Sequence, residues 1–298
     1  QRLKRWHSAP GGGAGAGFDQ TLAPRSGSVS NRTVVANQPL RFADFAVDAA
    51  RERIYAVCED HSAGGGDGGA CAAAAVVNSL VALSLDGRSR TLATLAEGAD
   101  FYAAPRLSAD GAQLAFVEWS HPSMPWDKTT LVLATLSGDD AAACAIASRV
   151  AVAGDDPLKP EAAMQPLWAP DGALHFVSDR SGWWTIYRTE LLHDDTGAIR
   201  GATAKPLLEI PAEFARAPWQ LRSQTYDLAR GVYLGGAGAG YGVAGVWSPQ
   251  ASATDQLLLL PSSSENEPSE ARPVALGATP LDGLFDELVC VVTAPAPP

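Results

Sequence analysis

The sequence has little charge, and the charge it has is mostly negative. Only 18% of its 298 residues are charged, and 22 Lys and Arg against 33 Asp and Glu give a formal net charge of −11. Nucleic acids and anionic membrane surfaces attract clusters of Lys and Arg, and no basic stripe is present. The apolar runs also stop well short of the ~18 residues that a membrane-spanning helix needs. We therefore expect neither nucleic acid nor a membrane as a partner.

Cysteines are few and far apart. The four are Cys58, Cys71, Cys144 and Cys290, and a chain of this length does not need disulfides to hold its core together. We expect them to be reduced and mostly buried, which favours the cytoplasm or a plastid stroma; a Cys58–Cys71 bridge is the alternative. Cys58, His61 and Cys71 lack the paired spacing of a zinc site, so we expect no metal.

The sequence also lacks the motifs that usually mark a catalytic or cofactor site. No serine has a glycine two positions away on each side, as a nucleophile elbow requires, and no histidine can be assigned to a triad. Gly240–Gly245 fits the dinucleotide-binding pattern by letter, but Trp247-Ser-Pro249 follows at once and prevents the helix that this motif needs. We interpret it as a glycine-rich loop between strands, and we expect no cofactor and no catalytic residue in this chain.

What the sequence does contain is a repeat. Val57, Val117 and Val177 each close a short apolar stretch after a turn, and consecutive members are 60 residues apart. In the two clearest copies, 105–117 and 166–177, an Asp-Gly turn separates two apolar strands. The Asp-Gly dipeptide is a strong hairpin signal because Gly accepts the positive φ of a tight turn.

Repeated strands of this kind predict a β-propeller. Each hairpin leads into a third apolar segment, and these segments are Leu80–Leu85, Leu131–Leu136 and Thr185–Thr189, with a fourth unit at 226–234, 245–247 and 256–260. Four-stranded antiparallel units that repeat at ~40–60 residues bury their faces against neighbouring units. We therefore predict an all-β fold, a partial β-propeller of about four to five four-stranded blades from a TolB-like ring of about six to eight.

The two ends of the chain differ from this regular middle. Residues 1–36 begin with Gln1–Trp6, which we interpret as the last strand of an upstream blade, and continue into a flexible insertion rich in Gly, Ala and Ser. Residues 37–298 are assigned to propeller blades. The last predicted strand, Glu287–Val292, has nothing to pair with in the sequence, so we expect exposed strand edges at the terminal blades.

A set of unusual segments runs through the predicted blades. The most specific are Met124-Pro-Trp-Asp127 and Ser178-Asp-Arg-Ser-Gly-Trp-Trp184, and the others are Asp100–Gly111, Trp119–Asp127, Trp168–Gly172, 59–61, 77–78, 212–214, 218–219 and 225–226. Together they resemble the propeller of prolyl-oligopeptidase-family serine peptidases, in particular the acylaminoacyl-peptidase and dipeptidyl-aminopeptidase-like branch. The resemblance covers roughly 40–247 and departs from the family at Thr130–Val132 and Leu221–Arg222.

The resemblance implies a propeller stacked on a C-terminal α/β-hydrolase domain that holds a Ser-Asp-His triad. Such a propeller screens which peptides reach the triad. This chain would then be the substrate-gating part of a serine peptidase of the aminopeptidase, acylaminoacyl-peptidase or oligopeptidase type, not catalytic alone, with the peptide and the hydrolase domain as partners. One alternative is a non-enzymatic TolB-like propeller that serves as a protein-binding scaffold. Another, a propeller lactonase or glycosidase, needs metal ligands or paired carboxylates at the central channel.

Three residues are candidates for substrate gating. Trp126 lies on a predicted loop that leaves a strand, where propellers meet substrates or partners, and Trp219 belongs to another of the resembling segments. Glu213 is the third, because the resemblance implies propeller-borne Glu side chains that bind the free amine of a substrate; a structural carboxylate is the alternative.

Two pairs of neighbours are given structural roles. Asp179 and Arg180 follow a predicted strand end, where a charged pair can lock adjacent blades. Trp183 and Trp184 are interpreted as neighbours on a strand, which places their side chains on opposite faces.

Overall fold

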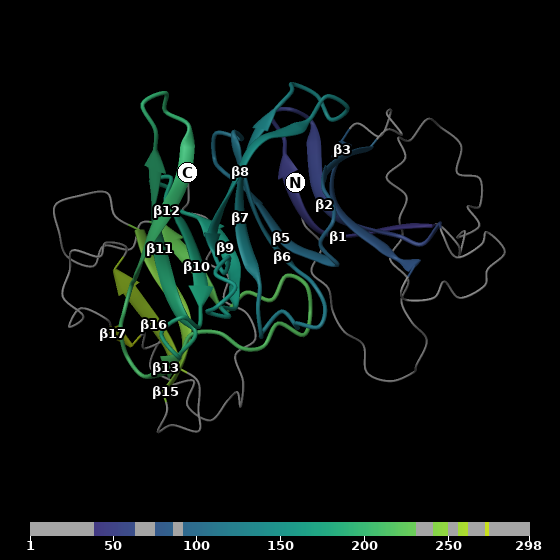
Figure 1. The fold of residues 1–298 in the computed structure, drawn as a ribbon. Helices are drawn as coiled ribbons and strands as arrows, with labels where there is room; N and C mark the ends of the chain where they lie inside the picture. The colour runs from purple at the N-terminus through teal and green to yellow at the C-terminus, as the bar shows by residue number, and fades with distance from the viewer. Residues whose placement is uncertain are drawn as a thin grey trace, which may run out of the picture.

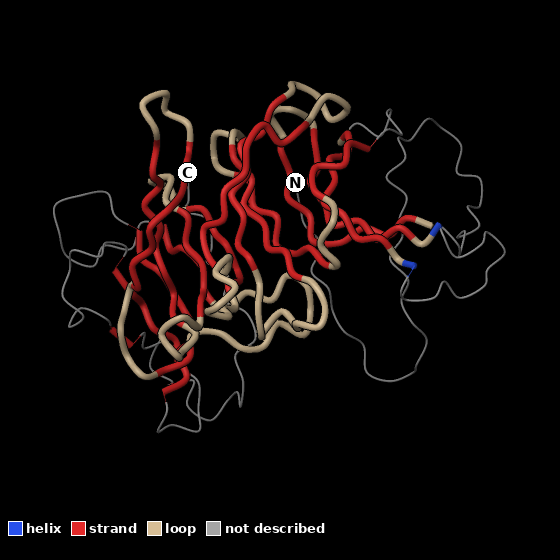
Figure 2. The backbone as a smooth tube through the Cα atoms, in the orientation of Figure 1, coloured by secondary structure: helices blue, strands red, loops and turns tan. Residues whose placement is uncertain are grey.

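The computed structural model describes residues 39–62, 75–85, 92–230, 241–249, 256–261 and 272–273. Nearly all regular structure in these residues is β-strand (Figures 1 and 2), so the all-β prediction is confirmed. No helix in this part of the chain is long and apolar enough to cross a membrane. The predicted segments 1–36 and Glu287–Val292, together with Cys71 and Cys290, lie outside the described residues.

The strands form antiparallel sheets that follow one another along the chain, and each sheet is one blade. Blade 1 contains β1 (Leu40–Asp48), β2 (Arg53–Asp60), β3 (Val77–Ser84) and β4 (Leu92–Ala96). Blade 2 contains β5 (Phe101–Leu107), β6 (Gln113–Trp119), β7 (Thr130–Ser137) and β8 (Ala145–Ala153). Blade 3 contains β9 (Ala163–Trp168), β10 (Leu174–Ser178), β11 (Thr185–His193) and β12 (Ile199–Pro206). The predicted units of hairpin plus third strand are therefore present.

Blade 4 has an interrupted first strand. β13 (Ala212–Glu213) and β14 (Tyr226–Arg230) both pair with β15 (Tyr241–Pro249), which is followed by β16 (Gln256–Pro261) and β17 (Arg272–Pro273). Residues 214–225, here named the 214–225 loop, separate the two halves of the strand.

The strand β15 corrects one prediction. A glycine-rich loop was expected at Gly240–Gly245, but from Tyr241 onward these residues lie in β15. The backbone of β15 pairs with β14 on one side and β16 on the other, and this two-sided pairing outweighs the weak strand preference of glycine.

The blades stack through middle strands that are buried on both faces. Successive side chains of a strand point to opposite sides of the sheet. In β6, Leu114 and Phe116 therefore pack with blade 1, whereas Ala115 and Val117 pack with blade 3. Val177 of β10 packs in turn with residues of blade 4. This face-to-face stacking of successive four-stranded sheets is the architecture of a β-propeller.

The first strands of blades 1 to 3 share a bulge that recurs every 60 or 61 residues. Asp44, Ala104 and Gln165 have φ values of 52°, 53° and 55°, and the strand register shifts beside each of them. Such a φ is uncommon for residues other than glycine, and a bulge re-aims the side chain out of the ladder. The Asp44 carboxylate accepts a hydrogen bond from Ala104 N at 2.6 Å, and Gln165 Oε1 accepts one from Thr225 N at 2.9 Å. These two bulges therefore tie their blades to the next.

Candidate functional site

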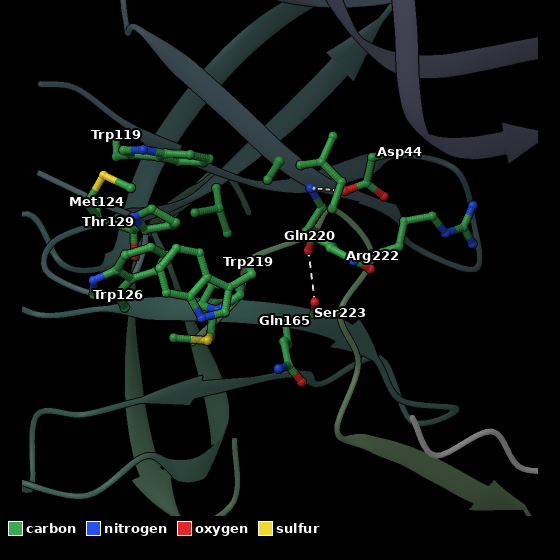
Figure 3. A pocket seen from close by; sticks show the side chains of 17 residues that line it. Asp44, Trp119, Met124, Trp126, Thr129, Gln165, Trp219, Gln220, Arg222 and Ser223 are labelled. Atoms are coloured by element: carbon green, nitrogen blue, oxygen red, sulfur yellow. Dashed lines mark hydrogen bonds between the residues drawn. The ribbon is translucent and has the colours of Figure 1, made fainter. Parts of the chain in front are cut away.

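A pocket of about 230 Å³ lies between the first strands of blades 2 and 3 (Figure 3). Strands β5, β6 and β9 supply its floor, and two loops supply its walls. One is the β6–β7 loop, residues 120–129, and the other is the 214–225 loop of blade 4. In Figure 1 these two loops run close together at the same end of the blades. The pocket therefore collects residues from all four described blades, with Asp44 of blade 1 hydrogen-bonded to the floor residue Ala104.

The β6–β7 loop is held by its own short-range hydrogen bonds. The Asp127 carboxylate accepts a hydrogen bond from Met124 N at 2.9 Å, and Asp127 N donates to Met124 O, also at 2.9 Å. At the end of the loop, Thr129 N donates to Glu161 O of the neighbouring blade at 2.9 Å. The Met-Pro-Trp-Asp segment is thus a fixed turn, which presents Met124 and Trp126 to the pocket.

The 214–225 loop is anchored at both ends and reaches across to the β6–β7 loop. The Thr225 hydroxyl lies 2.7 Å from Phe214 O, which closes the base of the loop, and Thr225 N is bonded to Gln165. The tip carries Trp219, whose side chain is 78% exposed. Its ring centroid lies 4.3 Å from that of Trp126, with 46° between the ring planes. The contact between the two tryptophans joins loops that are 93 residues apart in sequence.

The polar groups at the floor are mostly engaged by the protein. Asp44 is buried and accepts hydrogen bonds from Ala104 N and from Arg106 Nη1 at 3.2 Å. Gln165 Oε1 is used by Thr225, whereas Gln165 Nε2 is buried without a hydrogen-bond partner among the described residues. Because Asp44 is already neutralised by Arg106, the pocket offers mainly aromatic and apolar surface. Such an arrangement is suited to holding an apolar or aromatic group.

The structure brings together two of the three residues predicted to gate substrates. Trp126 and Trp219 line the same pocket, whereas Glu213 does not line it. The half-buried Glu213 carboxylate accepts a hydrogen bond from Trp184 N at 2.8 Å. Burial raises the pKa of Glu213, and the nearby negative charge of Asp179 raises it further.

Asp179 and Arg180 make their contacts with different partners. Asp179 accepts a hydrogen bond from Ala162 N at 2.8 Å, and burial raises its pKa. Arg180 binds Glu161, with 2.7 Å between Nη2 and Oε1. Glu161 in turn accepts a hydrogen bond from Gly154 N in blade 2 at 3.2 Å. Arg180 therefore reaches the neighbouring blade through Glu161, and the locking role of the pair stays a prediction.

The interpretation of Trp183 and Trp184 as strand neighbours is wrong. Strand β11 begins at Thr185, and both tryptophans lie in the turn before it. Gly182 has a φ of 87°, and its N–H donates to Asp179 O at 2.8 Å. This tight turn delays the start of the strand, and Trp184 instead pairs through its backbone with the start of blade 4.

Outside the pocket, the described residues contain neither a metal-binding cluster nor a reactive thiol. No group of three His, Cys, Asp or Glu side chains among them is arranged to hold a metal ion. Cys58 and Cys144 are buried free thiols, and burial raises the pKa of Cys58 to about 11. A thiol with such a pKa is a poor nucleophile at neutral pH.

Sequence reasoning missed the floor of the pocket. Ala104, Met164 and Gln165 line it; Met164 and Gln165 belong to none of the segments singled out in the sequence, and Ala104 lies in one of them, Asp100–Gly111, but was not named as a site residue. One signal was available, because Ala104 and Gln165 follow the 60-residue repeat from Asp44. Ala104 occupies the bulge position that is Asp44 in blade 1 and Gln165 in blade 3. Because the side chain of Ala104 is only a methyl group, there is space for the pocket beside it.

Comparisons with known proteins give solved structures only. No protein-family model and no curated protein matches the chain. A Mycobacterium tuberculosis puromycin-hydrolyzing peptidase matches with 28% identity and a TM-score of 0.60, over 80% of this chain and 32% of that one. A puromycin hydrolase matches with 26% identity and a TM-score of 0.55, over 76% of this chain and 31% of that one.

A mutant of puromycin hydrolase complexed with PGG matches equally well, with 27% identity, a TM-score of 0.55, and coverage of 76% of this chain and 31% of that chain. The chain thus spans about a third of the length of the structures it matches. These blades are similar to the propeller part of puromycin-hydrolysing peptidases of the prolyl-oligopeptidase family.

Proposed function

We propose that this chain is the propeller part of a serine peptidase and that the face with the tryptophan pocket screens the peptides that reach the catalytic domain. The observation that carries the proposal is the meeting of Trp126 and Trp219, on loops of two different blades, at a pocket in a chain similar to peptide-hydrolysing enzymes. Loops at one end of a rigid scaffold are where binding residues are usually placed.

The proposal assigns catalysis to residues outside this chain. Aromatic, thioether and amide side chains line most of the pocket, and its two hydroxyl groups, on Thr129 and Ser223, donate to the backbone carbonyls of Ala163 and Gln220. Neither is paired with a base, and such a pair is what covalent peptide hydrolysis requires. The similar structures extend over about three times the matched length. We place a Ser-Asp-His triad on an α/β-hydrolase domain in the part of the protein beyond residues 1–298.

A labelling experiment on the product of the complete coding sequence tests this assignment. The protein is treated with a fluorophosphonate probe, the labelled serine is located by mass spectrometry, and hydrolysis of aminoacyl and acyl-aminoacyl p-nitroanilides is measured. We expect hydrolysis, one labelled serine outside residues 1–298, and loss of activity when that serine is changed to alanine. Labelling of a serine within 1–298 would contradict the assignment. A product with neither label nor hydrolysis would identify the chain as a binding scaffold.

A further inference from the structure

Three of the eight large apolar side chains that are exposed on the described surface line the pocket. Met124 is 42% exposed, Leu221 is 45% exposed and Trp219 is 78% exposed, and all three line it. Exposed apolar groups that cluster in this way usually mark a surface that is covered when a ligand binds. Inside the pocket, Trp119 presents a ring that is stacked on Phe101 with centroids 5.2 Å apart. The pocket therefore has a fixed aromatic wall and an exposed aromatic rim.

The dimensions and chemistry of the pocket match a planar ring. An apolar cavity of about 150 Å³ is large enough to take up benzene, and this pocket measures about 230 Å³. Met124 and Met164 add two thioethers, which make favourable contacts with aromatic rings. Asp44 is already occupied by Arg106 and by a backbone N–H, so the floor does not select a cation.

We propose that this pocket binds an aromatic side chain of the peptide and thereby gives the propeller a preference for peptides that carry one. The inference rests on the proposed function for the identity of the occupant as a peptide. The binding step itself needs only residues of blades 2 to 4. Aromatic side chains carry most of the burial energy available to a peptide in a site of this kind.

The methionines allow the pocket to be observed directly. The sequence contains two methionines, Met124 and Met164, and both line the pocket. The complete protein labelled with ¹³C-methyl methionine gives one methyl signal from each methionine. The variants Met124→Leu and Met164→Leu identify the two signals that come from the pocket. A bound aromatic ring shifts both through its ring current.

The titration uses N-acetyl-L-tryptophanamide as the probe, with N-acetyl-L-alaninamide as its matched control. We expect saturable shifts of both methyl signals at millimolar probe, and no displacement of the probe by the same concentration of control. Trp219→Ala should weaken binding by about tenfold, since an aromatic contact and its buried area are lost. The exposed residue Leu158 lies outside the pocket and is 88% exposed, so Leu158→Ala should leave binding unchanged.

A second variant closes the pocket from its floor. Ala104→Gln introduces the residue that blade 3 has at the equivalent bulge, where Gln165 adopts nearly the same φ. We expect a folded protein in which the probe no longer shifts Met164. If Ala104→Gln fails to fold, Trp219→Ala decides the question alone, because its side chain is mostly exposed and its loss leaves the core intact.

Three results would overturn the inference: no shift of either methyl signal, equal binding of the alanine control, or tryptophanamide binding that Trp219→Ala leaves unchanged. These outcomes are separate from the failure of the proposed function. A protein without peptidase activity can still bind the probe, and an active peptidase can fail to bind it here. Absence of a labelled serine would refute only the proposed peptidase activity. Absence of methyl shifts would refute only the binding of an aromatic side chain in the pocket.

Discussion

Between pH 7.5 and pH 5, His175 should make the largest contribution to the pH dependence of the free energy of unfolding. This side chain on β10 is fully buried. Burial, together with the positive charge of Arg188, lowers its pKa from 6.5 to about 4. Since the unfolded chain binds the proton more tightly, the stability contributed by neutral His175 is complete above about pH 6.5 and is lost as the pH falls towards 4. Between pH 7.5 and pH 5 the loss amounts to ~2 kcal/mol, at about 1.4 kcal/mol for each pKa unit.

The assay is urea unfolding of the wild type and of His175→Gln at pH 7.5 and pH 5. The variant cannot titrate at this position. On going from pH 7.5 to pH 5, the free energy of unfolding of the wild type should therefore fall by ~2 kcal/mol relative to that of the variant. All other titrating groups are shared and cancel in this comparison, including Asp179 and Glu213, whose raised pKa values act in the opposite direction. Equal pH dependence in the two proteins would refute the reasoning.

Three further predictions concern Arg53, Glu213 and Cys58; those for Arg53 and Cys58 follow from the contacts described above, and the one for Glu213 follows from the family resemblance. Arg53 is buried against Asp48 at 3.1 Å and donates to Gly138 O of blade 2 at 2.9 Å, so Arg53→Met should lower the free energy of unfolding by ~3–5 kcal/mol in urea titration; a change below that of an exposed arginine variant would contradict this. Glu213→Gln in the complete protein should raise KM for peptides with a free amine and leave KM for their N-acetylated forms unchanged; an equal change for both would show a structural role. The Cys58 thiol is buried and has a raised pKa, so iodoacetamide should modify it only after unfolding, as followed by mass spectrometry of the peptide that contains Cys58. Rapid modification of Cys58 itself in the folded protein would exclude the described packing of blade 1.

The blades could be predicted because their signals are local. An Asp-Gly turn between apolar strands specifies a hairpin within about a dozen residues, and Asp110-Gly111 and Asp171-Gly172 both sit in turns between paired strands. The strand at Tyr241–Pro249 could not be predicted in this way. Its glycines give it little strand preference of their own, and the strand exists because β14 and β16 pair with it.

Only part of the pocket could be predicted from the sequence. Trp126 and Trp219 stood out through the family resemblance, but their contact depends on how two loops from different blades are anchored. The anchors are backbone hydrogen bonds such as Thr129 N to Glu161 O, which leave no mark on residue type. The repeat spacing aligns Ala104 with Asp44, yet only the structure shows that a missing side chain there leaves room for the pocket.

The most direct test of the account is the rate of peptide hydrolysis by the complete protein with and without the exposed tryptophan. We would measure kcat/KM for a matched pair of peptides, one with an aromatic residue and one with alanine at the same position, in wild type, Trp219→Ala and the control Leu158→Ala. We expect hydrolysis with a preference for the aromatic peptide that falls by about tenfold in Trp219→Ala and is unchanged in Leu158→Ala. Hydrolysis with the same preference in all three proteins would contradict a role of this propeller face in selecting peptides.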